Sequence, residues 1–102
     1  MDWKKKLLEE GFLELGPFRV ELSLDNTFLD LDYIPRVIVY DEVSGSWYVM
    51  RNPIPRGETL SEGWKNAVDV LERACRLEEV DLGDREVSRR FIEVFRKFCR
   101  EF

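Results

Sequence analysis

Histidine and glutamine are absent from this chain of 102 residues, and no recognisable catalytic motif is present. Histidine is the side chain whose ordinary pKa places its change of charge near neutral pH. Without it, general acid–base catalysis would need a carboxyl, amine or thiol group with a shifted pKa. We therefore expect a protein that is not an enzyme and that uses no cofactor.

Long apolar segments are also absent. No run approaches the roughly 20 apolar residues that a helix needs to span a bilayer, and residues 1–8 lack the apolar core of a secretory signal. The sequence contains no internal repeat, and its length fits one domain with its own core. We expect a single cytoplasmic domain without membrane contact.

Positive charge is in deficit. The 16 lysines and arginines are outnumbered by 21 aspartates and glutamates, which gives a net charge of −5. This balance argues against general affinity for nucleic acid, whose phosphates select basic surfaces, and mildly favours a basic partner. The richness in glutamate and arginine is typical of proteins from thermophiles.

Alternation of apolar and polar side chains predicts strands in the first half of the chain. Residues 18–24 and 27–33 form one predicted hairpin, and Pro35 should end its second strand. Residues 36–41 and 46–51 are dense in β-branched and aromatic side chains, and they predict a second hairpin.

Capping residues predict three helices. The first covers residues 2–10. Thr59 and Glu62 fit a capping box that opens a central helix running to about residue 77, and the last helix starts near Asp84. The order of one helix, four strands and two helices predicts an α+β fold. In it, an antiparallel sheet made of two hairpins is covered by helices on one face.

Both cysteines, Cys75 and Cys99, lie on the apolar stripes of predicted helices. A free cysteine in such a place usually behaves as a small buried hydrophobe. We favour this interpretation over a disulfide between the last two helices, which the sequence leaves open.

Asp30 and Asp32 share one face of the predicted strand at 27–33, with Asp25 nearby. Carboxylates can hold Mg²⁺ through oxygen, and a nuclease could use such a pair. The solvent face of any half-exposed strand has the same spacing. We favour the solvent face and expect no metal site.

The last helix is unusually rich in phenylalanine. Its apolar stripe contains Phe91, Phe95, Phe98 and Phe102. Large exposed apolar patches mark interaction sites, so we expect these side chains to form a partner or dimer surface. Acidic residues interrupt the arginines of this helix, which favours a solvated face with ion pairs over a stripe that contacts nucleic acid.

The second hairpin and the central helix together carry a recognisable series of motifs. The hairpin strands read Val37-Ile38-Val39-Tyr40 and Trp47-Tyr48-Val49, and the helix opens with Gly57-Glu58-Thr59-Leu60, then Glu62 and Asn66-Ala67. On these motifs, residues 34–77 resemble the HicB-type antitoxin domain. Five features depart from that pattern. Residues 1–33 have no counterpart in it, and the last helix is too short to be the usual DNA-reading segment. Gly63 stands where alanine is usual, Trp64 stands where leucine is usual, and the loop at residues 52–56 is shortened.

The resemblance implies a non-enzymatic protein-binding module whose partner would be a small basic ribonuclease like the HicA toxins. Acidic side chains would suit such a partner by charge complementarity. The candidates are Glu21, Asp25, Asp30, Asp32, Asp41 and Glu42. The alternative is a stand-alone homodimeric accessory or regulatory protein, of host or mobile-element origin, that shares only the fold. Its dimer would form through the last helix or through the unprotected edge of the 36–51 hairpin.

Overall fold

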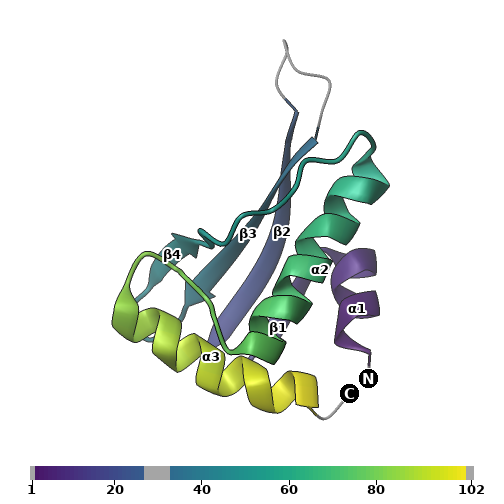
Figure 1. The fold of residues 1–102 in the computed structure, drawn as a ribbon. Coiled ribbons are helices and arrows are strands. Elements are labelled where there is room, and N and C mark those ends of the chain that lie inside the picture. The colour runs from purple at the N-terminus through teal and green to yellow at the C-terminus, as the bar shows by residue number, and fades with distance from the viewer. Residues whose placement is uncertain (1, 27–32, 101–102) are drawn as a thin grey trace.

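The computed structural model describes residues 2–26 and 33–100, which fold as an α+β domain (Figure 1). As the sequence predicts, one helix, a four-stranded antiparallel sheet and two further helices follow one another. The elements are α1 (Trp3–Glu10), β1 (Phe12–Leu15), β2 (Phe18–Asn26), β3 (Tyr33–Asp41), β4 (Ser46–Val49), α2 (Leu60–Leu77) and α3 (Arg85–Arg100).

The strands form a meander in the order β1-β2-β3-β4, so each strand pairs with its neighbour along the chain. Val20 of β2 pairs with Val39 of β3, and Val39 pairs with Tyr48 of β4. Cross-strand partners point to the same face of a sheet. This inner face meets the helices, while the outer face carries none of the described helices (Figure 1).

The third strand differs from the prediction, because β3 continues through Pro35 from Tyr33 to Asp41. Val37 accepts a hydrogen bond from Met50 N–H at 2.8 Å, so Val37 directs its backbone groups away from β2. Pro35, two residues earlier, directs its backbone to the same side. Because β4 ends at Val49, the missing N–H of Pro35 removes no ladder hydrogen bond.

The first hairpin also differs from the prediction. Its strands are β1 and β2, joined at Gly16, whose φ of +57° few other residues adopt. The sequence analysis assigned no strand to Phe12–Leu15, since four residues are too short to show a clear period. Of the strand predicted at residues 27–33, only Tyr33 lies within the described residues.

The predicted helix starts are confirmed by their caps. The Asp2 carboxylate accepts two backbone hydrogen bonds from the first turn of α1. Thr59 Oγ1 accepts from Glu62 N–H at 3.1 Å, and Asp84 Oδ1 accepts from Val87 N–H at 3.0 Å. Each cap satisfies a donor that a helix end otherwise leaves unpaired. Every helix in the described part of the chain is too short or too polar to cross a bilayer.

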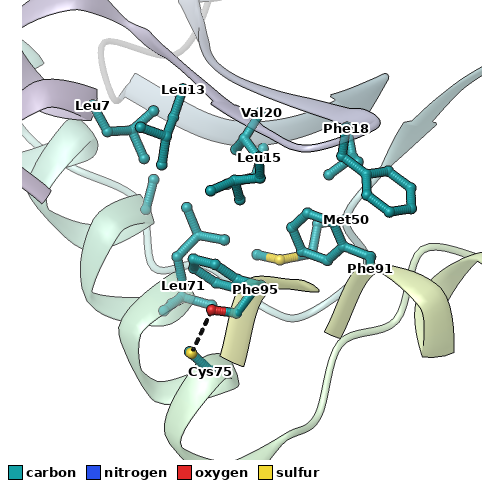
Figure 2. Packing of buried hydrophobic residues seen from close by; sticks show 14 of the residues in the cluster. Leu7, Leu13, Leu15, Phe18, Val20, Met50, Leu71, Cys75, Phe91 and Phe95 are labelled. Carbon is teal, nitrogen blue, oxygen red and sulfur yellow. Dashed lines mark hydrogen bonds between the residues drawn. The ribbon is translucent and has the colours of Figure 1, made fainter. Parts of the chain in front are cut away.

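One hydrophobic core lies between the inner sheet face and the three helices (Figure 2). Aromatic side chains join its two halves. The ring of Phe18 in β2 meets Phe91 edge-on with centroids 5.3 Å apart, and Trp3 of α1 meets Phe95 in the same way at 5.2 Å. Edge-to-face contacts of this kind add to the free energy of burial.

The phenylalanines of α3 therefore correct a prediction. Phe91 and Phe95 are 0% and 1% exposed, so the expectation that they form a partner or dimer surface is wrong. They complete the core of their own chain because the sheet and α1 leave room for both rings. Phe98 is partly buried against the same core, and Phe102 lies outside the described residues.

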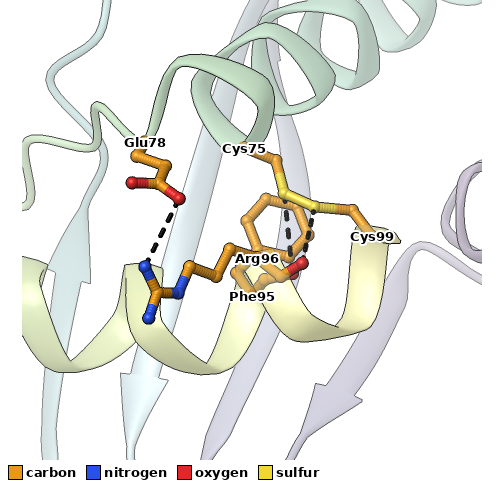
Figure 3. Close-up of a disulfide and its surroundings, with 5 residues drawn as sticks. All are labelled: Cys75, Glu78, Phe95, Arg96 and Cys99. Carbon is orange, nitrogen blue, oxygen red and sulfur yellow. Dashed lines mark hydrogen bonds and ion pairs between the residues drawn. A yellow bond between two sulfur atoms is a disulfide. The ribbon is translucent and has the colours of Figure 1, made fainter. Parts of the chain in front are cut away.

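A disulfide between Cys75 and Cys99 joins α2 to α3 (Figure 3). The expectation of free cysteines is therefore wrong, although the expected burial of Cys75 is confirmed. The apolar stripes of the two helices pack together and bring the sulfur atoms to the same place. An ion pair between Arg96 and Glu78, with N and O atoms 3.4 Å apart, links the same two helix regions.

Candidate functional site

The outer sheet face carries an apolar cluster where β3 meets β4. Its members, which we call the outer apolar cluster, are Ile38, Tyr40, Trp47 and Val49. Tyr40 faces Trp47 with ring centroids 4.6 Å apart, and Ile38 faces Val49. Trp47 and Val49 are 55% and 45% exposed. The cross-strand pairs stabilise the hairpin, yet much of their apolar area remains in contact with solvent.

Beside this cluster, the outer face carries a group of paired polar side chains around Arg19. Arg19 Nε lies 2.9 Å from Glu21 Oε1, and Arg19 Nη1 lies 3.9 Å from Glu14 Oε1. The guanidinium carbon of Arg19 is also 4.2 Å from the centroid of the Phe12 ring. One guanidinium therefore interacts with two carboxylates and one aromatic ring on this part of the face.

The strand β4 is also one edge of the sheet (Figure 1). The hydrogen bond from Met50 N–H, one residue after β4, to Val37 O shows which backbone groups face β3. Because alternate residues of an antiparallel strand face the same neighbour, Tyr48 also directs its backbone groups toward β3. Trp47 and Val49 direct their N–H and C=O groups toward the sheet edge. The same two residues expose their side chains on the outer face.

The linker between α2 and α3 covers the edge just beyond β4. Arg51 N–H donates to Asp81 O at 2.7 Å, and Asp81 N–H donates to Asn52 Oδ1 at 2.9 Å. Asn52 Nδ2 in turn donates to Glu79 O at 3.0 Å. The open part of this edge is therefore confined to Ser46–Val49, which contains no charged residue. Natural edge strands are protected by shortness, by charge or by cover, and β4 is short but has neither charge nor cover.

Asp41 holds the β3–β4 turn in place. Its side chain is 0% exposed and accepts hydrogen bonds from Val43 N–H at 3.1 Å, Ser44 Oγ at 3.0 Å and Arg90 Nη2 of α3 at 2.6 Å. The hydrogen bond from Arg90 lowers the pKa of Asp41, against the opposing effect of burial. Because the turn is bonded to α3, the hairpin presents β4 in a defined position.

The acidic residues that were expected on a partner surface differ in their exposure. Asp41 is buried, so its assignment to such a surface is wrong, whereas Glu42 is exposed in the adjoining turn. Asp30 and Asp32 lie outside the described residues. Within residues 2–26 and 33–100, no group of three or more histidine, cysteine, aspartate or glutamate side chains could hold a metal ion.

Several arginines of α3 are engaged by carboxylates. Arg90 binds Asp41, and Arg89 Nη1 lies 3.4 Å from Glu93 Oε1 one turn along the helix. Arg96 binds Glu78 at the end of α2. These pairs favour the interpretation of a solvated, ion-paired face.

A second apolar surface lies between α1 and α2. Leu8 and Leu60 are 41% and 54% exposed beside a groove of about 670 Å³ that Trp64 also lines. The indole nitrogen of Trp64 is buried and donates no hydrogen bond within the described part of the chain. This groove presents side chains alone, without the unpaired strand backbone of β4.

An open edge of this hairpin was expected from the sequence, but Trp47 and Val49 were not expected to be binding residues. A signal was present. The run Ser46-Trp47-Tyr48-Val49 has apolar side chains on both faces, although only one face can meet the core of a sheet covered on one side.

Comparison of the chain with protein-family models, curated proteins and solved structures found no match.

Proposed function

We propose that this chain is a non-enzymatic protein-binding module that receives a β-strand of its partner along β4. One observation supports this most strongly. At Trp47 and Val49, outward backbone hydrogen-bonding groups coincide with exposed apolar side chains. In strand addition, main-chain hydrogen bonds provide affinity, and alternate side chains provide specificity. Both elements are present on these two residues.

The support beneath β4 favours the same function. Asp41 bonds the turn to Arg90 of α3, and Tyr48 packs against the core from the inner face. A binding strand held from two directions loses little conformational freedom when a partner docks, which lowers the free-energy cost of association.

Toxin neutralisation is the more specific version of this proposal. It rests on the HicB-type resemblance and on the arrangement of the hairpin β3–β4, a short connection and α2 capped by Thr59. The exposed carboxylate of Glu42 beside β4 would suit a small basic ribonuclease. In this version, the ribonuclease contributes the added strand.

Val49→Pro tests the proposal with little disturbance of the fold. Proline has no N–H donor, and the N–H of Val49 points toward the edge, so the ladder to β3 stays intact. Leu77→Lys is a matched control, because Leu77 is 58% exposed but lies on α2. The wild type and both variants are used to capture partners from cells of the native host. Each captured protein is then purified and titrated by calorimetry.

We expect one partner that binds the wild type and Leu77→Lys but not Val49→Pro. The proposal fails if every captured protein, and a second copy of this chain, binds Val49→Pro as tightly as it binds the wild type. If the partner is a ribonuclease, its cleavage of RNA should stop when the wild type is added. Unchanged cleavage would contradict toxin neutralisation alone.

A further inference from the structure

We infer that the strand added to β4 is β4 of a second copy, so that two sheets join edge to edge about a two-fold axis. This inference rests on the proposed function and names its partner. It is supported by the pattern of backbone hydrogen-bonding groups, by the charges beside β4, and by the burial or pairing of two acidic residues.

The backbone pattern is self-complementary. In an antiparallel pair, two residues in a hydrogen-bonded position exchange both N–H···O bonds. With Tyr48 on the two-fold axis, Trp47 of one copy faces Val49 of the other, and these are the two residues with outward groups. The same patch on both chains thus satisfies itself, as a two-fold interface requires.

This register is favoured over the nearest alternative. With Trp47 on the axis, Val49 would face Gly45 of the other copy. Gly45 N–H already donates to Asp41 O at 2.8 Å within its own turn, so each copy would lack one donor. The register centred on Tyr48 uses every N–H and C=O group of β4 that points toward the edge. It also keeps the pairing within Ser46–Val49, before the point where Asp81 covers the edge.

The side chains match as well. In this register Trp47 lies against Val49 of the other copy on the outer face, which joins the two outer apolar clusters into one. Aromatic and β-branched side chains form favourable cross-strand pairs.

The charges favour a second copy over a basic partner. β4 itself is uncharged, so no like charges meet across the axis. Antiparallel pairing brings the turn of one copy, with exposed Glu42, toward the end where exposed Arg51 follows β4 in the other. By contrast, two of the acidic residues expected to meet a basic protein are engaged within the fold, since Asp41 is buried and Glu21 is paired with Arg19.

Light scattering and sedimentation equilibrium from micromolar to millimolar concentration test the inference on the full chain. We expect the wild type and Leu77→Lys to form dimers. Val49→Pro should raise the dimer dissociation constant by roughly thirtyfold, since each copy loses one donor. Trp47→Lys, which keeps every backbone donor, should also weaken the dimer, because it places a charge in the joined cluster. Circular dichroism verifies that both variants remain folded.

Cross-linking tests the register independently. Tyr48→Cys places two thiols across the axis at a distance that a disulfide can span, so mild oxidation should give a covalent dimer. Val49→Cys places its thiol opposite Trp47 and should give much less. Equal cross-linking of the two variants would overturn the register.

A wild type that stays monomeric at every concentration overturns the inference, as does a dimer that Val49→Pro leaves unchanged. The proposed function fails separately. If the chain is monomeric but a captured partner is lost with Val49→Pro, strand addition stands and the second copy is excluded. If Val49→Pro changes neither self-association nor capture, both proposals are excluded.

Discussion

Arg90 Nη2 of α3 lies 2.6 Å from Asp41 Oδ2 at the end of β3. The two residues are 49 positions apart in the sequence, and their contact joins the last helix to the hairpin that carries the proposed binding edge. The carboxylate is fully buried, whereas the Arg90 side chain is 31% exposed. Burying a charge is costly unless it is paired and hydrogen-bonded, and Asp41 has three donors around it.

Asp41→Asn should lower the free energy of unfolding by about 2 kcal/mol, the range for hydrogen bonds to a charged group. Asparagine keeps the size of the side chain but loses the charge and one acceptor oxygen. Urea denaturation measures the change. Glu42→Gln, an equivalent substitution at the exposed neighbour, should stay within about 0.5 kcal/mol of the wild type. Equal effects of the two variants would contradict the role given to Asp41.

The stability contributed by Asp41 should depend on pH. Its pKa in the folded protein is lowered from 3.8, chiefly by the hydrogen bond from Arg90. The folded protein therefore holds the ionised form more strongly than the unfolded chain does. The contribution is complete well above pH 3.8 and is lost as the pH falls through the lowered pKa.

The matching measurement compares the wild type with Asp41→Asn by urea denaturation across this range. The difference in their free energies of unfolding should be largest near neutral pH and should shrink below about pH 4. Other carboxylates titrate in both proteins and cancel in the difference. A difference that is constant with pH would contradict the prediction.

Gly57→Ala should destabilise the fold by about 3 kcal/mol, the upper part of the range for overpacking. A Cβ atom at Gly57 would lie 2.7 Å from Gly63 Cα, so the backbone at the start of α2 would have to move. Gly45→Ala is the control. Gly45 has φ of +72° but open space around it, so alanine there should cost only about 1 kcal/mol of conformational strain. Thermal or urea denaturation that ranks the two variants in the opposite order would count against the close approach.

Cys99→Ser should lower the free energy of unfolding by about 3 kcal/mol, the usual effect of opening a disulfide that closes a loop of this size. The two cysteines are separated by 24 positions. Reductant provides the internal control. It should bring the wild type to the stability of Cys99→Ser and should leave that variant unchanged. A wild type indifferent to reductant would show that the bond contributes little.

Local signals in the sequence determined the helices and much of the sheet. Asp2, Thr59 and Asp84 were identified as caps or helix starts from sequence, and each caps its helix in the structure. Alternation at residues 18–24 likewise predicted a strand whose Phe18 and Val20 are buried. Such features depend on neighbours within about four residues, so these helices and this strand could be derived without the tertiary structure, whereas β1 could not.

Only the tertiary structure decided how far each strand extends and whether the two cysteines are free or joined in a disulfide. Pro35 usually ends a strand, yet it is accommodated in β3 because β4 has already stopped beside it. The state of Cys75 and Cys99 depended on whether two helices that meet through packing bring the sulfur atoms together. Neither outcome is encoded in nearby residues.

The candidate site shows the same division. Phe91 and Trp47 are both large aromatic residues, and only the phenylalanine was expected on a binding surface. The core had room for Phe91 beneath the sheet, whereas the register of β3 and β4 turned Trp47 to the outer face. Burial follows from the space that distant elements leave between them, so it was decided by the assembled fold and not by the pattern of either segment.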